Sequence, residues 1–419
     1  MSFFSGFRAR VKCSSLCVRP AFSGRRFAAL SFVFFFSVFA AQPLPQSSQR
    51  EKLPKPRMLD KGVRWQRDPA TGELHLLHTE PREDESPGAS AASPPRAVVG
   101  EVSRIVPITC SVFASDGTPL RGLTAHSFRV FDDGLERPIE IFDAGANQPA
   151  RIALVIDASP SVLPDTDQMK LAAGALIEGL APADEVAVVD FSAHTYVQSG
   201  FTSVRELLRR AVARVSVRDL LGDTGGSNIY EAVYLTASEL FPASPGRKAI
   251  VLLTDGQDSG LGLTFDPASA SPRPGEIDNR LTFDDVTREL AAKDIQVFAV
   301  STENRPRILA PSWFAAHRGN TFLSEDARQT GIPAYTLYLA EIVRRSGGEL
   351  YFLNEAGSLA DTFRRIAQRV GAEYTLGVPP SPSAAGAPHP GWHELRVETV
   401  GLGETQVIHR SAYYVPPAQ

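Results

Sequence analysis

Continuous apolar runs divide the middle of the chain into a regular series. Five such runs lie between residues 150 and 371: Ile152–Ile156, Val186–Phe191, Ala249–Leu253, Ile295–Val300 and Leu350–Leu353. Runs that lack polar alternation are typical of strands buried on both faces, as in a parallel sheet. The pattern therefore predicts five strands of a mostly parallel sheet in this part of the chain.

The segments between these runs have the periodicity of helices. They are Gln168–Gly179, Val204–Val215, Ile229–Leu240, Asp284–Ala292, Leu337–Arg345 and Leu359–Val370. Strands that alternate with helices predict an α/β fold with a doubly wound, mostly parallel sheet over residues 150–371. The order of the elements leaves the order of the strands in the sheet open.

Short stretches of alternating apolar and polar residues flank this domain, in residues 97–149 and 372–419. Turn signals separate them, such as Asp132-Asp133-Gly134 and the hairpin signal Gly401-Leu-Gly403. Isolated hairpins are only marginally stable in water. We therefore expect the two segments to pair into one small antiparallel β unit, with the α/β domain inserted between them.

Residues 1–40 have the layout of a secretory signal peptide. Six basic residues and no acidic one lie in the first 41 positions, and the apolar run Phe27–Ala40 has 14 residues. A retained membrane anchor is the alternative, but a spanning helix needs about 18–20 apolar residues. We expect an exported protein, periplasmic, cell-surface or secreted, with no stable membrane span after cleavage. Arg25-Arg26 leaves Sec and twin-arginine export both open.

Residues 41–96 are rich in Pro, Ser, Arg and Glu. Such a composition buries little apolar surface, so it predicts a disordered linker, with one short strand near Leu74–His78. Residues 259–282 and 301–332 interrupt the α/β series and are expected to be long loops, which are usually functional or mobile.

The net charge limits the classes of partner, and the cysteine content limits the possible disulfides. Without the predicted signal peptide the chain has 37 basic residues (43 less six) against 47 acidic ones, a net charge of −10. This balance argues against nucleic acid and anionic membrane, which attract basic patches. Cys110 is the one cysteine outside the signal region, so no internal disulfide is expected, and its apolar neighbours predict a buried core residue.

Two carboxylates and three hydroxyls stand where a metal could be bound. Asp157 and Asp255 each end an apolar strand, Ser159 and Ser161 follow the first, and Ser227 precedes a helix. The carboxyl ends of strands in an open α/β sheet are where ligands bind. If the two strands are neighbours, these hard oxygen donors suit Mg²⁺ or Mn²⁺.

Each of these motifs has a structural explanation when it is taken alone. The Asp157-x-Ser-x-Ser161 motif is a common helix cap, Ser227 could cap the helix that follows it, and Asp255-Gly256 is a turn signal. Their combination is more specific, because both aspartates end apolar strands and the three motifs occur in one order.

These motifs resemble those of a von Willebrand factor type A domain with a metal ion-dependent adhesion site. Thr254-Asp255-Gly256 is similar to the family's third motif. The resemblance implies that Ser159, Ser161 and Ser227 ligate the metal through hydroxyls. It also implies that Asp157 and Asp255 act directly or through water.

The chain departs from the family pattern at two positions. The family usually has Thr where this chain has Ser227, a change that keeps the hydroxyl. Pro160 within the first motif is less usual, and it puts the stiffness of that loop in doubt.

The flanking segments resemble a bacterial subgroup, the VWFA-related proteins abundant in Acidobacteria. The matching stretches are Asp116–Leu123, Phe128–Gly134, Tyr374–Gly377 and Trp392–Tyr414. The function of that subgroup is poorly defined, so this resemblance bears on architecture more than on biology.

The resemblance implies a non-enzymatic protein that binds a protein partner through the metal, with an Asp or Glu of the partner completing the coordination. Two alternatives stay open: a scaffolding envelope protein with a non-functional metal site, and a Mg²⁺-dependent phosphohydrolase. The hydrolase would need a second carboxylate where Ser159 stands. The histidines (such as His194, His317, His393 and His409) lie in no catalytic motif. The partner and the oligomeric state stay open.

Overall fold

The computed structural model describes residues 52–69, 72–79, 105–145, 149–217, 226–242, 246–258, 281–302, 334–352, 359–370, 373–381 and 389–415. The predicted signal peptide and most of the two predicted long loops lie outside these residues. Within the described ranges, no helix is both long enough and apolar enough to cross a membrane.

A seven-stranded sheet forms the centre of the α/β domain. Its strands are β1 (Arg57–Met58), β8 (Arg151–Asp157), β9 (Glu185–Phe191), β10 (Thr195–Thr202), β11 (Lys248–Thr254), β12 (Gln296–Ser301) and β13 (Leu350–Phe352). Their order is β1-β10-β9-β8-β11-β12-β13. The apolar runs predicted β8, β9, β11, β12 and β13, and these five strands are parallel. β10 and β1 are antiparallel additions at one edge. The predicted α/β fold with a mostly parallel sheet is confirmed.

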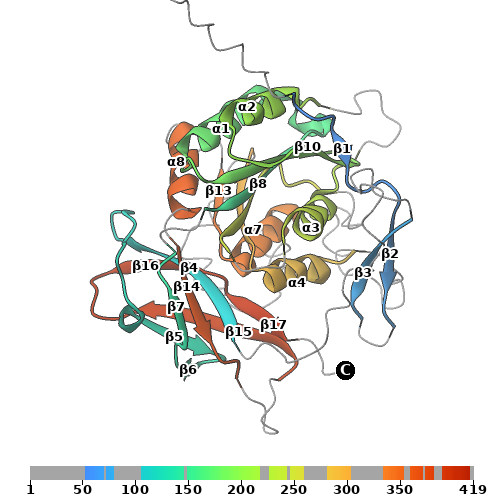
Figure 1. The fold of residues 1–419 in the computed structure, drawn as a ribbon. Coiled ribbons are helices and arrows are strands. Elements are labelled where there is room, and N and C mark those ends of the chain that lie inside the picture. Colours follow the sequence, from blue (N-terminus) through green and yellow to red (C-terminus); the bar gives the residue numbers. More distant parts are fainter. Residues whose placement is uncertain are drawn as a thin grey trace, which may run out of the picture. The chain divides into compact units, whose positions relative to one another are not determined.

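Helices cover both faces of this sheet (Figure 1). One face packs on α1 (Thr166–Gly179), α2 (Arg205–Arg214) and α8 (Leu359–Val370), and the other on α3 (Ile229–Leu240), α4 (Phe283–Lys293) and α7 (Ala334–Ser346). Successive residues of a strand point to opposite faces. In β8, Ile152, Leu154 and Ile156 accordingly join the first core, and Ala153 and Val155 join the second. Both cores are apolar, which explains why the strands have no polar alternation.

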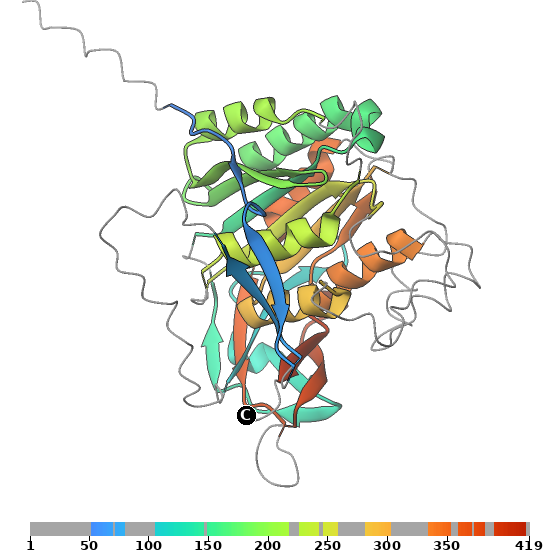
Figure 2. The same ribbon diagram turned by 90° about the vertical axis from the view of Figure 1, so that its right-hand side faces the viewer.

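Residues 57–78 differ from the predicted disordered linker. β1 pairs with β10, and β2 (Val63–Arg67) with β3 (Leu74–His78) forms a hairpin whose second strand matches the expected one. Figure 2 shows this blue hairpin beside the α/β domain, where the ring of Trp65 lies 5.2 Å from that of Tyr234 on α3. Composition predicted disorder because apolar residues are few here, but those present pack against the folded domain.

The flanking segments form a β-sandwich of two four-stranded sheets, with orders β16-β4-β14-β7 and β17-β15-β5-β6. The strands are β4 (Val106–Ala114), β5 (Phe128–Asp132), β6 (Leu135–Arg137), β7 (Ile141–Asp143), β14 (Glu373–Val378), β15 (Gly391–Thr399), β16 (Thr405–His409) and β17 (Ala412–Val415). Each sheet mixes strands from before and after the α/β domain. The predicted pairing of the two segments is therefore confirmed, and Cys110 lies fully buried in their shared core.

One glycine allows the sandwich to approach the α/β domain closely. A Cβ on Gly347 would lie 2.3 Å from the Arg410 backbone nitrogen, whereas one on the neighbouring Gly348 would lie 1.9 Å from the Val297 carbonyl oxygen, inside the α/β domain itself. Gly347 also has a φ of 83°, which L residues rarely adopt. The Arg410 side chain in turn donates to the Ala291 carbonyl near the end of α4 (2.9 Å), which is a second contact between the two parts.

Candidate metal site

The residues predicted to bind metal meet at the carboxyl edge of the central sheet. β8 and β11 are adjacent and parallel, with Ile156 beside Leu253. Asp157 therefore ends its strand next to Thr254, and Asp255 follows immediately. The condition on which the sequence prediction rested, that the two strands are neighbours, is met.

Asp157 is the centre of a hydrogen-bond network. Its side chain is buried (2% exposed). Oδ1 accepts from the Ser159 N–H (2.9 Å), and Oδ2 accepts from the hydroxyls of Thr254 (2.6 Å) and Ser227 (3.4 Å). Thr254 was not among the predicted ligand residues. Its hydroxyl fixes the Asp157 carboxylate, and the Thr-Asp-Gly motif was the sequence signal for it.

Ser159 and Ser161 lie on the turn after β8. Their hydroxyl oxygens are 3.1 Å apart, and Ser161 is exposed while Ser159 is buried. A short 3₁₀ helix, Pro160–Asp165, begins directly after Ser159. Pro160 occupies its first position, where the fixed φ of proline fits and its missing N–H is not needed. The unusual proline therefore fits this turn, and Ser161 leaves the group open to solvent.

Ser227 and Asp255 complete the group from two further turns. Both are buried, and Ser227 lies just before α3. The Asp255 carboxylate accepts from the Gln257 N–H (2.9 Å), and Gly256 between them has a φ of 87°. Hydrogen bonds thus connect four of the five predicted ligand residues, namely Asp157, Ser159, Ser161 and Ser227. Asp255 interacts with Asp157 through charge.

The electrostatics of this group favour a bound cation. Burial raises the pKa of Asp157 to about 6, repulsion from Asp255 adds to the rise, and the hydrogen bonds from Ser159 and Thr254 oppose it. In the part of the chain that the structure describes, neither carboxylate forms an ion pair with Lys, Arg or His. Two buried carboxylates that share no cation are costly. A divalent ion held by them and the hydroxyls would remove that cost, so the donor set fits the metal implied by the resemblance.

A second polar group, which sequence analysis missed, lies at the start of α3. Burial raises the pKa of Glu231 to about 7, and repulsion from Asp60 and Asp258 adds to the rise. Asp60 lies 2.6 Å from the His194 ring nitrogen, and Asn228 donates to Glu231 (3.4 Å). Asp258 follows Asp255 in one run and could have been noticed. Asp60 comes from the predicted linker, where no sequence signal indicated it.

Comparisons with known proteins agree with the motif assignment in the α/β domain. Residues 152–257 match the profile of the von Willebrand factor type A domain. This range contains every predicted ligand residue. No curated protein matches the sequence significantly.

Solved structures that are similar to the chain are distant in sequence. An aerotolerance-related membrane protein from Bacteroides fragilis is 16% identical, with 53% of this chain and 98% of that chain covered and a TM-score of 0.36. Proximal thread matrix protein 1 from the mussel byssus, described with a zinc-occupied MIDAS motif, is 18% identical over 57% and 49% of the two chains (TM-score 0.35). A von Willebrand factor type A protein from Catenulispora acidiphila is 13% identical over 74% and 75% (TM-score 0.35). By its matched profile, the segment 152–257 is similar to the von Willebrand factor type A domain.

Proposed function

We propose that this chain is an exported, non-enzymatic protein that binds a protein partner through a divalent metal ion. The metal is Mg²⁺ or Mn²⁺, held by Asp157, Ser159, Ser161, Ser227 and Asp255. One observation carries the proposal: two buried carboxylates lie at the open edge of the sheet with hydroxyls around them, and no described Lys, Arg or His forms an ion pair with either. The match of residues 152–257 to the type A domain supports it.

The donor set indicates both the metal and the way it binds a partner. All five side chains offer oxygen, which favours Mg²⁺ or Mn²⁺ over zinc. The three hydroxyls are neutral, so the two aspartates only balance the charge of the ion. The ion stays electrophilic and accepts a further carboxylate. We therefore infer that an Asp or Glu of the partner completes the coordination.

The arrangement of the serines supports a binding role over hydrolysis. Ser159 stands where a phosphohydrolase would have its second carboxylate, and its hydroxyl lies 3.1 Å from the Ser161 hydroxyl. The hydroxyl oxygens are thus placed together as ligands would be.

Export is supported by the sequence alone, through the basic and apolar pattern of residues 1–40. We propose the cell envelope or its surroundings as the place where the partner is met. The mature chain has one buried cysteine and needs no disulfide there.

The test begins with the metal. Titration calorimetry should detect Mg²⁺ binding to the mature protein and none to Asp157→Ala/Asp255→Ala. The matched control is Asp167→Ala, which removes an exposed carboxylate on α1 and should bind as the wild type does. Equal binding by the wild type and the double variant would contradict the assignment.

Partner binding is tested separately, by pull-down from cell envelope in Mg²⁺ and in EDTA. Capture should be lost in EDTA and with Asp157→Ala, but kept with Asp167→Ala. Alanine scanning of the captured partner should then find one acidic residue whose loss equals the effect of Asp157→Ala. Capture that persists undiminished in EDTA would rule out the metal-bridged carboxylate.

A further inference from the structure

A group of potential metal ligands lies in the β-sandwich, outside the α/β domain that carries the first site. Asp132 ends β5, Asp133 follows it in the turn to β6, and His393 lies on β15, which pairs with β5. One ligand atom from each of the three residues lies within 4.8 Å of the other two. The group thus joins a strand that precedes the α/β domain to one that follows it.

The hydrogen bonds of His393 fix which ring nitrogen is free for a ligand. Its Nε2 lies 2.6 Å from the His389 carbonyl oxygen, which only accepts, so Nε2 must carry a hydrogen. Nδ1 faces two carboxylate oxygens, Asp133 Oδ2 at 2.8 Å and Asp132 Oδ1 at 3.7 Å. The ring is buried and stacks on Tyr413 with centroids 4.8 Å apart. Nδ1 is therefore the ring nitrogen open to a metal ion, and it faces these two oxygens.

Asp132 supplies an independent sign that this group can take a ligand. Its side chain is fully buried, and its Oδ2 accepts from the Ser381 N–H (2.7 Å) and the Tyr413 hydroxyl (2.8 Å). Its Oδ1 is also buried, yet accepts no hydrogen bond from any described residue. A buried carboxylate oxygen without a donor is unfavourable. This oxygen lies on the side of His393, where a cation would satisfy it.

Asp133 gives the group an opening to solvent. Its side chain is 46% exposed. The residue has a φ of 49°, and its Oδ1 accepts from the Glu394 N–H (2.8 Å), which directs Oδ2 toward His393. The turn thus holds a carboxylate over the buried pair, and an ion can enter from this side.

We propose that Asp132, Asp133 and His393 bind a transition-metal ion of the Zn²⁺ type, distinct from the Mg²⁺ proposed for the α/β domain. One imidazole nitrogen with two carboxylate oxygens suits Zn²⁺ better than the all-oxygen set of the first site does. Zn–N and Zn–O distances of about 2.0–2.2 Å place tetrahedral ligand atoms about 3.3–3.6 Å apart, so small shifts from the observed 2.8 and 3.7 Å suffice.

The surroundings of the three ligands fit the same assignment. Metal-binding histidines commonly donate their other N–H to a carbonyl or carboxylate, as Nε2 of His393 does to His389. Water completes the coordination at the side where Asp133 is exposed. The bound ion links β5 to β15 and so joins the segment before the α/β domain to the segment after it, within one sheet of the sandwich.

The test uses the mature protein with Asp157→Asn/Asp255→Asn, so that the first site takes no metal. Zn²⁺ titration of this background should give one ion per chain, and Zn²⁺ should raise its Tm. Adding Asp133→Asn should weaken binding at least tenfold and remove the rise in Tm. Asn keeps the turn, because it tolerates positive φ and still accepts from Glu394. This exposed position avoids the risk that variants of buried Asp132 or His393 do not fold.

The matched control is Glu136→Gln, which removes an exposed charge on β6, in the same hairpin, that pairs with Arg129 instead. It should bind Zn²⁺ as the background protein does. Bound Co²⁺ should also show the visible absorption of a tetrahedral nitrogen and oxygen site, and Asp133→Asn should lose it. No Zn²⁺ binding by the background, or binding that Asp133→Asn leaves unchanged, would overturn the proposal. The three residues would then be a hydrogen-bonded group that holds no metal.

Discussion

Asp157 and Asp285 are both buried aspartates of the α/β domain, 2% and 5% exposed, but their pKa values are shifted in opposite directions. Burial raises the pKa of Asp285, yet hydrogen bonds from Arg67 and then Thr282 outweigh it, and the pKa lies below its ordinary value. Burial also raises the pKa of Asp157, and there the outcome is a value of about 6. The same residue type at similar depth therefore has two different roles.

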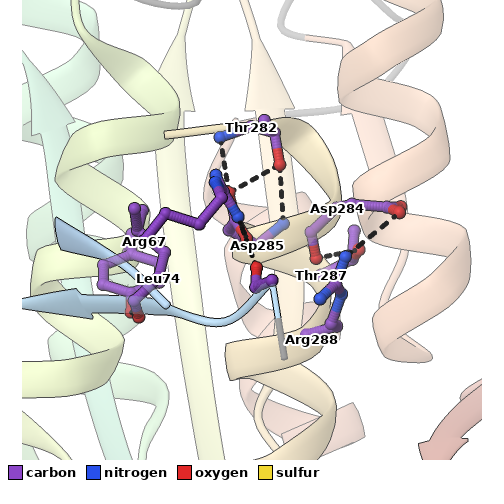
Figure 3. A network of polar contacts seen from close by, with 9 residues as sticks. Arg67, Leu74, Thr282, Asp284, Asp285, Thr287 and Arg288 are labelled. Carbon is purple, nitrogen blue, oxygen red and sulfur yellow. Dashed lines mark hydrogen bonds and ion pairs between the residues drawn. The ribbon is translucent and has the colours of Figure 1, made fainter. Parts of the chain in front are cut away.

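The Asp285 group is complete within the chain (Figure 3). Arg67 donates to both carboxylate oxygens, at 2.9 and 2.7 Å, and the Thr282 N–H and hydroxyl donate at 2.9 and 2.6 Å. Asp285 also returns its own N–H to the Thr282 hydroxyl, so the pair caps the start of α4. Every oxygen has a donor, and the charge has its counter-ion.

Among the described residues the Asp157 group has no such counter-ion, and a second carboxylate, Asp255, interacts with it instead. Hydroxyls satisfy its hydrogen bonds but do not neutralise its charge. In this comparison Asp285, whose cation the chain supplies, is structural, and Asp157 is the carboxylate for which we propose a bound metal ion. Substitutions at the two sites should therefore change stability in opposite directions.

The largest effect is expected from Arg67→Ala. This change leaves Asp285 buried without its cation, which should lower the free energy of unfolding by about 3–5 kcal/mol. It should also release the β2–β3 hairpin, since Arg67 is its ion-pair link to α4. Urea unfolding of the mature protein measures the change in the free energy of unfolding. Arg64→Ala, exposed on the same strand, is the control and should cost under about 0.5 kcal/mol. Equal costs for the two variants would show that the ion pair contributes nothing.

A smaller effect of opposite sign is expected from Asp157→Asn. Removing an uncompensated buried charge should stabilise the metal-free protein by about 1–3 kcal/mol, the range that follows from a pKa raised from 3.8 to about 6. Binding of Mg²⁺ should be lost at the same time. Calorimetric unfolding in EDTA and in Mg²⁺ measures both. Asp285→Asn is the comparison and should destabilise in both buffers. A lower Tm of Asp157→Asn in EDTA would refute the idea that this carboxylate is uncompensated.

The parts of the fold that the sequence predicted are those in which local pattern and tertiary burial agree. Helix α3 was predicted as Ile229–Leu240 and has those bounds, and each predicted strand of the parallel sheet was found within a residue or two. Such strands are buried on both faces, so their apolar runs are continuous. The carboxyl ends of those runs located Asp157 and Asp255.

The parts that escaped prediction depend on partners distant in sequence. β10 (Thr195–Thr202) has a mixed sequence, and only its pairing with β9 places it in the sheet. Arg67 lies 218 residues from Asp285, so the composition around it indicated a linker. Asp60 likewise reaches Glu231 only because β1 joins the sheet edge. No local pattern encodes these contacts.

The smallest effect of the three concerns pH. A proton and a metal ion compete for Asp157, so Mg²⁺ affinity should be constant above pH 7 and fall about tenfold per pH unit below about pH 6.

The stability of the metal-free protein should show the reverse trend with pH. Because the pKa of Asp157 is higher in the folded state than its ordinary 3.8, folding is favoured at low pH, and stability should decline as the pH rises from about 4 to about 6. Calorimetric titration and unfolding at matched pH values measure both, and Asp157→Asn should show neither the affinity nor this decline. Affinity that stays constant from pH 7.5 down to pH 5 would show that Asp157 is ionised over this whole range. The charge of Asp157 would then be compensated in the metal-free protein, contrary to the prediction.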